Sequence, residues 1–322
     1  MKTISLFKVS AVCVVLAALI VLMSLGALTI GSADYSLKQI ADAVIYGAEG
    51  PVQIVVYNLR LPRIIMALEV GACLAVAGAL LQSVMRNPLA DPGIIGVSAG
   101  AATAATTILL LYPAMLSAVP LFAFGGASLA CVLIYILAWH DGVDPVRIIL
   151  SGVAINTVLG AYNAFLQMLN SDNLSNVLAF MNGSLSGCNW EQIYVISAYS
   201  LIGLICGFAC IKSANILQLG DEMASGLGVN VSRVRILLSA VGAFLAAATV
   251  SVAGMIGFIG LVVPHIARMM VGSDYRALLP VSTLLGAFLL LAADTLGRTL
   301  VTGMEIPVGI IMAATGGPFF LY

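Results

Sequence analysis

The feature that most constrains this chain is a succession of apolar stretches, each close to the roughly 20 residues that a helix needs to cross a bilayer. They lie at roughly 10–30, 63–82, 93–112, 118–139, 147–169, 192–211, 232–252, 256–271, 278–297 and 306–322. They predict an all-α polytopic membrane protein with about ten transmembrane helices. The eighth stretch is short and contains Pro264, so we expect that helix to be broken or tilted.

Composition indicates a single membrane domain and excludes other classes. Hydrophobic residues make up 61% of the 322 residues and charged residues only 8%, against about 25% in a soluble domain. No linker or low-complexity tract divides residues 1–322. A net charge of −1 and the lack of a basic patch argue against nucleic-acid binding. The six cysteines form no disulfide framework, and Cys206 and Cys210 have no further ligand near them in sequence, so we predict no metal site.

The positions of lysine and arginine predict the orientation. With a cytoplasmic N-terminus and alternating helices, nine basic residues face the cytoplasm and four face outward, as the positive-inside rule requires. An even number of spans then places both termini in the cytoplasm. Three of the outward residues are arginines near helix ends, namely Arg60, Arg63 and Arg298. Arginine in an apolar chain seeks an interface or a partner, so these three are candidate functional residues.

Capping signals predict local structure in two connections. Ser36 to Gln39 has the form of a capping box, and apolar residues then repeat at helical spacing up to Ile45. We expect a short amphipathic helix there, on the outer membrane surface. In the second connection, Asp91 is predicted to cap the third membrane helix, with Pro92 at its first position.

A polar cytoplasmic loop at about 212–231 is too hydrophilic to span the membrane. Asp221 and Glu222 suit the first turn of a short helix, and Gly226 or Gly228 suits its end. Such a helix would expose the apolar side chains of residues 223 and 227 for docking to another protein. The alternative is a solvated connecting loop.

Polar residues inside the predicted spans allow two interpretations. Asn156, Gly160, Asn163 and Gln167 share one stripe of a helix, where they either line a water-filled pathway or make interhelical hydrogen bonds. Glu69 and Asp294 either couple transport to protons or have a structural role. The sequence has neither the Gly-x-x-x-x-Gly-Lys-Ser/Thr motif nor a nucleophile–base constellation, so we predict that the chain itself is not an enzyme.

Several motifs, in order along nearly the whole chain, resemble those of the permease subunits of bacterial ABC importers for iron chelates, haem and vitamin B12. They are Leu59 to Arg63, Asn87 to Gly100 (NPLADPGIIGVSAG), Gly220 to Gly228 (GDEMASGLG), Gly257 to His265 with Arg268, Asp274 to Pro280, Ala293-Asp294 and Glu305 to Gly309. The resemblance implies a homodimer in the cytoplasmic membrane of a bacterium or archaeon. It also implies two cytoplasmic ATPase subunits that use ATP and Mg, an extracytoplasmic substrate-binding protein, and no cofactor bound by this chain.

The resemblance also assigns roles to residues. Arg60, Arg63 and Arg298 match positions that pair with acidic residues of the binding protein. The matching segment for ATPase coupling consists of Gly220, Asp221, Glu222, Met223, Ala224, Ser225, Gly226, Leu227 and Gly228. The family further leads us to expect a few more residues, often basic, after Tyr322.

The cargo follows from a weaker analogy. The external stretch Met181 to Gly187, followed by Asn189 and Trp190, resembles ferric-siderophore permeases more than vitamin B12 permeases. We therefore predict an iron–siderophore complex as cargo, with haem or vitamin B12 as alternatives within the family. An alternative of another class is an ion-coupled secondary transporter that uses Glu69 or Asp294.

Overall fold

The computed structural model describes residues 6–31, 35–45, 50–140, 142–170, 174–301 and 303–321. Within these ranges all regular structure is helical, apart from one isolated bridge between Trp139 and Val143. In the described part of the chain, seven helices are long and apolar enough to cross a membrane, and three further apolar helices are shorter. The prediction of an all-α polytopic membrane protein is therefore confirmed.

Each of the ten predicted apolar stretches overlaps one of these helices. The long ones include α1 (Leu6–Thr29), α4 (Leu61–Met85), α6 (Val119–Ala138), α7 (Pro145–Leu169), α9 (Trp190–Ala209), α12 (Val231–Ala253) and α14 (Tyr275–Thr299). The shorter ones are α5 (Val97–Leu111), α13 (Ile259–Val271) and α15 (Val308–Leu321). A helix of 13 residues such as α13 rises only about 20 Å, less than the hydrocarbon thickness of about 30 Å.

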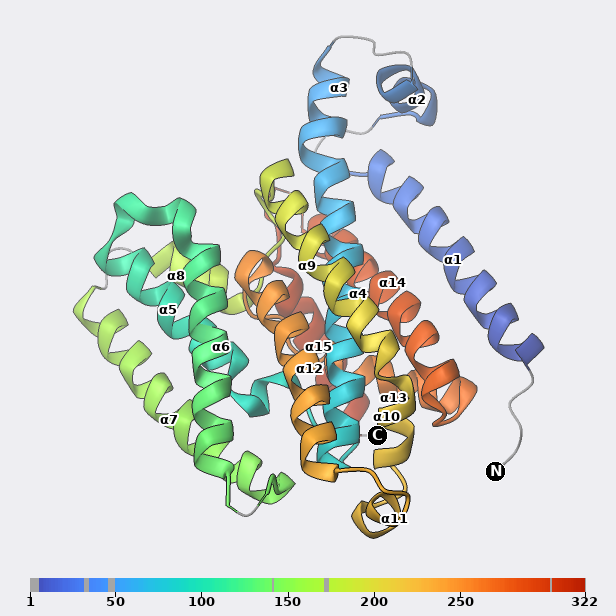
Figure 1. Cartoon of the computed structure of the whole chain (residues 1–322). Coiled ribbons are helices and arrows are strands. Elements are labelled where there is room, and N and C mark those ends of the chain that lie inside the picture. The colour runs from blue at the N-terminus through green and yellow to red at the C-terminus, as the bar shows by residue number, and fades with distance from the viewer. Residues whose placement is uncertain are drawn as a thin grey trace.

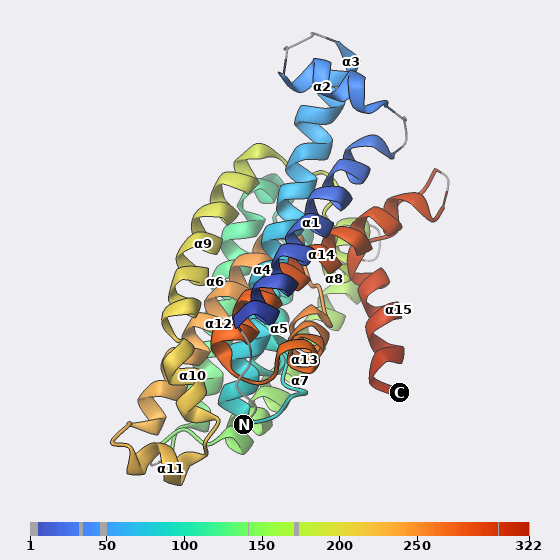
Figure 2. The same cartoon turned by 90° about the vertical axis from the view of Figure 1, so that its right-hand side faces the viewer.

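Helix α4 lies at the centre of the bundle, between α9, α12, α13 and α14 (Figures 1 and 2). Every residue from Val70 to Met85 is buried, which is the pattern of a helix that is apolar on all sides. Its sequence permits close packing because it is rich in glycine and alanine. Lipid supplies no hydrophobic force between helices, so close backbone contact is a main source of association.

Two glycines of α4 show how tight this packing is. A Cβ atom at Gly71 would lie 2.3 Å from the carbonyl oxygen of Gly286 on α14. A Cβ atom at Gly78 would lie 1.9 Å from the carbonyl oxygen of Gly260 on α13. Any larger residue at either position would force two helices apart.

Three segments distant in sequence meet at a junction formed by backbone hydrogen bonds. The amide of Met255 donates to the carbonyl of Phe180 at 2.9 Å, and the amide of Gly309 donates to that of Gly183 at 3.2 Å. The junction lies between α8 (Leu174–Asn182), the non-helical residues before α13 and the start of α15. It pairs backbone groups that are costly to leave unpaired within a membrane protein. Helix α8 was not among the elements predicted from the sequence.

The capping predictions are confirmed, with one correction. The amide of Ser36 donates to Gln39 Oε1 at 2.9 Å, and the amide of Gln39 donates to Ser36 Oγ at 3.3 Å, at the start of α2 (Leu37–Ile45). Asp91 Oδ1 accepts from the amide of Gly93 at 2.7 Å. However, Asp91 caps the 3-10 turn η2 (Pro92–Ile95), and the left-handed Gly96 separates that turn from α5. The prediction therefore named the correct capping residue but assigned it to the wrong helix.

The remaining short elements lie at the two ends of the molecule. At the end that carries α2, α3 (Pro51–Val55) and the π-helix η1 (Val56–Arg60) extend α4 outward, and η3 (Pro113–Ala118) precedes α6. At the opposite end lie α10 (Ile211–Leu217) and α11 (Asp221–Gly226). The start of α1 and the end of α15 both point toward the α11 end (Figures 1 and 2).

The contact between α4 and α13 generates a stability prediction. The Gly78→Ala variant should lose about 1–3 kcal/mol of unfolding free energy, because overpacking forces the backbones apart. Thermal unfolding of the purified protein in detergent measures the loss. The Gly125→Ala variant is the matched control, since a Cβ atom there has no other atom within 4 Å. Equal melting temperatures for the two variants would contradict the packing described here.

Candidate functional site

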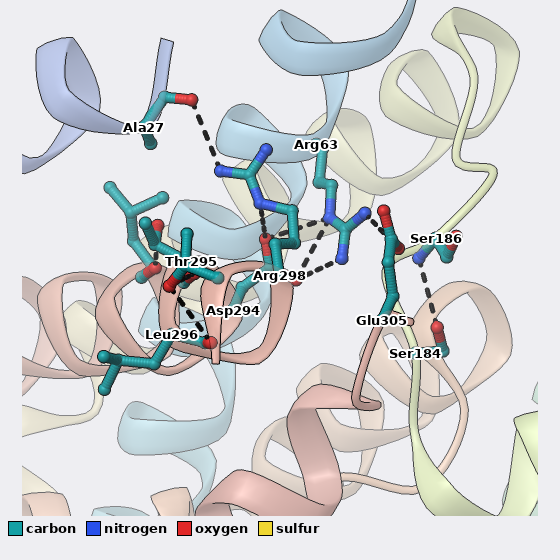
Figure 3. A network of polar contacts seen from close by, with 11 residues as sticks. Ala27, Arg63, Ser184, Ser186, Asp294, Thr295, Leu296, Arg298 and Glu305 are labelled. Atoms are coloured by element: carbon teal, nitrogen blue, oxygen red, sulfur yellow. Dashed lines mark hydrogen bonds and ion pairs between the residues drawn. The ribbon is translucent and has the colours of Figure 1, made fainter. Parts of the chain in front are cut away.

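Two of the three predicted docking arginines, Arg63 and Arg298, meet in one network of charged side chains at the end of the molecule opposite α11 (Figures 1 and 3). Arg63 lies in the first turn of α4, while Asp294 and Arg298 lie one turn apart near the end of α14. Glu305 lies in the connection between α14 and α15. Four charged side chains from separate parts of the chain thus meet at one place.

Arg63 makes the strongest interactions in this cluster. Its Nε lies 2.9 Å from Asp294 Oδ2, and its Nη2 lies 2.9 Å from Asp294 Oδ1, so the pair is bidentate. Its Nη1 donates to Glu305 Oε2 at 2.7 Å. Arg63 is only 8% exposed and Asp294 only 2%. Bidentate charge-assisted bonds of this kind fix the geometry of both partners.

The other two arginines also make contacts within the chain. Arg298 Nε lies 3.6 Å from Asp294 Oδ2, and Arg298 Nη2 donates to the carbonyl of Ala27 at 3.3 Å. Arg60 donates from Nη1 to the carbonyl of Leu28, and its guanidinium lies 5.1 Å from the centre of the Tyr35 ring. Both arginines therefore tie the end of α1 and the residues that follow it to the rest of the bundle.

These contacts change the expected picture of the docking arginines. The sequence suggested three arginine side chains that project toward a partner, whereas the structure buries Arg60 and Arg63 and pairs Arg63 with two carboxylates. The physical reason is that a charged guanidinium near the end of a membrane helix is stabilised more by an internal carboxylate than by apolar surroundings. Their contribution to docking stays a prediction.

Glu305 is the partly exposed member of the cluster, with a half-exposed side chain. Burial by itself would raise the pKa of Glu305, but the hydrogen bond and the positive charge of Arg63 outweigh it, so the pKa lies below its usual range. Glu305 therefore remains ionised at neutral pH and keeps its bond to Arg63.

The two carboxylates proposed for ion coupling have structural partners. Asp294 lies between Arg63 and Arg298 and makes an ion pair with each of them. Glu69 Oε1 accepts a hydrogen bond from Ser197 Oγ on α9 at 2.7 Å. The structural interpretation of Asp294 is therefore favoured over a role in secondary transport.

The polar stripe of α7 faces neighbouring segments of the same chain. Asn156 Nδ2 donates to the carbonyl of Gly93 at 3.1 Å, and Asn163 Nδ2 donates to Thr103 Oγ1 at 3.2 Å. Gln167 Nε2 lies 3.4 Å from the sulfur of Met181 on α8, while Gly160 is exposed. Of the two interpretations, interhelical bonding describes these three amides, and the lining of a pathway stays a prediction.

At the opposite end, α11 forms the short helix that the sequence predicted. Met223 and Leu227 are 64% and 63% exposed, while Ala224 between them is fully buried. The helix begins after Gly220 and is followed by Gly228, and both glycines have positive φ angles, of 96° and 78°. Side chains other than glycine rarely adopt such angles, so the two glycines define the ends of the turn that presents α11.

A buried arginine anchors α11 to the bundle. Arg235 on α12, only 4% exposed, donates from Nη2 to both carboxylate oxygens of Asp221 at 2.8 and 2.9 Å. Its Nη1 donates to the carbonyl of Val143, just before α7, at 2.8 Å. Arg86, which follows α4, lies 3.6 Å from Asp221 Oδ1. Asp221 thus connects α11 to α12 and to the end of α4, and Arg235 extends the connection to the start of α7.

The sequence identified Arg63 and Asp221 as candidate site residues but not the residues that pair with them. Glu305, Arg86 and Arg235 were assigned no role. The low charge content was the available signal, because a chain with only 8% charged residues offers few candidates for each ion pair. Within the described ranges, no group of three or more His, Cys, Asp or Glu side chains is placed to hold a metal ion.

The lowered pKa of Glu305 generates a prediction about pH. A carboxylate with a folded-state pKa below its unfolded value stabilises the protein fully above the unfolded pKa, about 4.3, and loses this effect as pH falls through the folded pKa. The Glu305→Gln variant should therefore melt at a lower temperature than the parent at pH 7. The gap between them should shrink as pH falls below about 4. A gap that stays constant from pH 7 to pH 3.5 would contradict the ion pair.

Comparison with known proteins identifies the family and relatives of this chain. The model of the FecCD transport family matches residues 16–322. The chain is 40% identical over 309 residues to the Fe(3+)-citrate import system permease protein YfmD of Bacillus subtilis, covering 96% of this chain and 92% of that protein. It is 43% identical over 278 residues to the cobalamin import system permease protein BtuC of Halobacterium salinarum, covering 86% and 75%.

A solved structure described as an inward-facing conformation of a metal-chelate type ABC transporter superposes with a TM-score of 0.86 at 30% identity, covering 97% of both chains. The family match, the identities and the shared fold agree over nearly the whole length. The chain therefore belongs to the FecCD transport family, whose relatives named above are permease proteins of import systems.

Proposed function

We propose that this chain forms the membrane-spanning half of an ATP-driven importer for an iron–siderophore complex. Two copies would surround the pathway, two ATPase subunits would bind at the α11 end and use ATP with Mg, and an extracytoplasmic binding protein would deliver the cargo. The observation that carries the proposal is α11, where apolar Met223 and Leu227 are exposed on a turn anchored through Asp221. An exposed apolar pair on a fixed helix is the surface that a partner protein can use.

The contacts of Asp221 suggest how a movement of the partner reaches the membrane. A force on α11 passes to α12 through the two hydrogen bonds that Arg235 Nη2 donates to the carboxylate of Asp221. Arg235 also bonds Val143, at the entrance to α7, so the same side chain links α7 to the movement. Segment 220–228 thus acts as the coupling element, with Gly220 and Gly228 as its ends.

The topology that accompanies this proposal has ten membrane crossings and both termini in the cytoplasm. It is supported by the ten apolar helices of the described residues. It is also supported by the direction of two of them, because the start of α1 and the end of α15 both point toward α11. The short helix α13 then crosses together with the non-helical residues before it, and both that segment and the start of α15 are held by the backbone bonds of the junction.

The outer cluster is proposed to attract the binding protein as a unit. Arg60, Arg63 and Arg298 carry three positive charges against the two negative charges of Asp294 and Glu305, which leaves an excess of one positive charge within the cluster. A local excess of positive charge favours a partner with acidic lobes, even where the guanidinium groups are paired internally.

Binding of the cognate binding protein tests this role. The Arg60→Gln variant should bind about five- to tenfold more weakly than the parent at low salt, and the difference should shrink at 0.5 M salt because ions screen the attraction. Lys212→Gln, an exposed change on α10 at the other end, serves as control. An unchanged affinity in Arg60→Gln at low salt would remove the arginine cluster from docking.

The iron–siderophore cargo rests on the relatives rather than on a ligand site in this chain. An iron-citrate permease and a cobalamin permease are similarly close to it, so haem and vitamin B12 stay as alternative cargoes within the same function. Competition for uptake among ferric citrate, a ferric hydroxamate, haem and cobalamin would distinguish them.

Reconstitution tests the function itself. In proteoliposomes that contain the permease, its ATPase and its binding protein, uptake should require ATP and should not follow an imposed ion gradient. The double variant Met223→Ser/Leu227→Ser should reduce ATPase co-purification and uptake by about tenfold or more, since each buried apolar side chain contributes about 1.5–3 kcal/mol.

The matched control is Ile54→Ser, an equally exposed apolar change on α3 at the opposite end, which should leave ATPase co-purification unchanged. Uptake by the permease alone, driven by an ion gradient, would instead establish a secondary transporter.

A further inference from the structure

A long apolar groove runs between α6 and α12, two helices that lie side by side in Figure 1. Its volume is about 780 Å³. Its rim includes Val132, Ile136 and Trp139, which are 54%, 63% and 55% exposed. A groove of this size on the apolar surface of a membrane protein faces either lipid chains or another protein.

The polar atoms of the groove are satisfied within its floor. The Tyr135 hydroxyl donates to Ser239 Oγ across the floor, and Ser239 is 1% exposed. Cys131 and Ala243 are each 8% exposed and complete the floor. The groove therefore offers an occupant an apolar surface without a fixed hydrogen-bonding requirement.

The shape of the groove suits a single hydrocarbon chain. One end is closed by aromatic rings, where Phe124 and Phe244 meet edge to face with centroids 5.9 Å apart and Tyr199 stacks on Phe124 at 5.5 Å. The other end reaches Trp139, the residue after α6. The 15 residue-to-residue steps from Phe124 to Trp139 correspond to about 22 Å of helix, which is more than the depth of one leaflet, about 15 Å.

The Trp139 end has the chemistry of a membrane interface with negative charge. Tryptophan is enriched at the level of lipid headgroups. Arg233 is exposed in the first turn of α12, and it precedes Ile236 and Ala240 of the groove by three and seven residues, so it lies on the same face of that helix. An arginine at this place complements a phosphate, and basic residues near the membrane surface favour anionic lipids.

We propose that this groove is a binding site for one anionic phospholipid of the leaflet at the α11 end. An acyl chain lies along the groove toward Phe124, Trp139 lies at the level of the glycerol esters, and Arg233 binds the phosphate. The site would hold a lipid against α12, the helix whose Arg235 anchors α11. The proposal does not depend on which cargo the protein carries.

Fluorescence of Trp139 tests the site. The chain has two tryptophans, so the Trp190→Phe variant leaves Trp139 as the only one. This variant is reconstituted in phosphatidylcholine vesicles that contain a few per cent of a lipid with brominated acyl chains, which quench tryptophan on contact. Brominated phosphatidylglycerol should quench about two- to threefold more than brominated phosphatidylcholine at the same mole fraction, because Arg233 selects the anionic headgroup.

Variants distinguish a specific site from general contact with lipid. Arg233→Gln should bring the quenching ratio of the two lipids close to one, whereas Arg276→Gln, an exposed arginine at the start of α14, should leave the ratio unchanged. Ala240→Leu, which fills the rim, should reduce quenching by both lipids. Native mass spectrometry of the parent protein should show retained phosphatidylglycerol in excess over phosphatidylcholine.

Two results would overturn the proposal. Equal quenching by the two brominated lipids would show ordinary contact with the surrounding bilayer. Absence of quenching by either lipid would show that another protein surface, such as a second copy of this chain, covers the groove.

Discussion

The buried ion pair between Arg63 and Asp294 is the interaction on which the outer half of the structure depends. Arg63 starts the central helix α4, and Asp294 lies near the end of α14, which packs along α4 through Gly71 and Gly286. Loss of one member of a buried pair typically costs about 3–5 kcal/mol, because the remaining charge is left without a partner. The bidentate geometry also fixes the register of the two helices at this end.

From this pair the network extends to segments that have little other polar contact. Glu305 ties the connection between α14 and α15 to Arg63, and Arg298 ties the end of α1 to Asp294. The opposite end is built differently, because Asp221 and Arg235 hold α11 in place while Met223 and Leu227 stay exposed. At one end, therefore, Arg63, Asp294 and Glu305 form ion pairs within the molecule. At the other end, an anchored helix exposes apolar side chains. This asymmetry fits the proposal that an ATPase binds at the α11 end.

The helices were predictable from the sequence because a run of about 20 apolar residues has few alternatives to a membrane helix. The caps at Ser36 and Asp91 and the exposed pair on α11 were also predictable, since each depends on residues within one or two turns. The junction of the α8 segment with Met255 and Gly309 was not, because backbone bonds between distant segments leave no local pattern. The arginines were identified correctly as unusual, but a sequence alone does not say that Arg63 pairs with Asp294, 231 residues away.

A double-mutant cycle between Arg63 and Asp294 tests this account most directly. Unfolding free energies are measured in detergent for the parent, Arg63→Gln, Asp294→Asn and the double variant. The account predicts that each single change destabilises the protein by about 3–5 kcal/mol and that the double change costs clearly less than their sum, which gives a coupling energy above about 1.5 kcal/mol. Additive effects, with a coupling energy below about 0.5 kcal/mol, would contradict the central role of this pair.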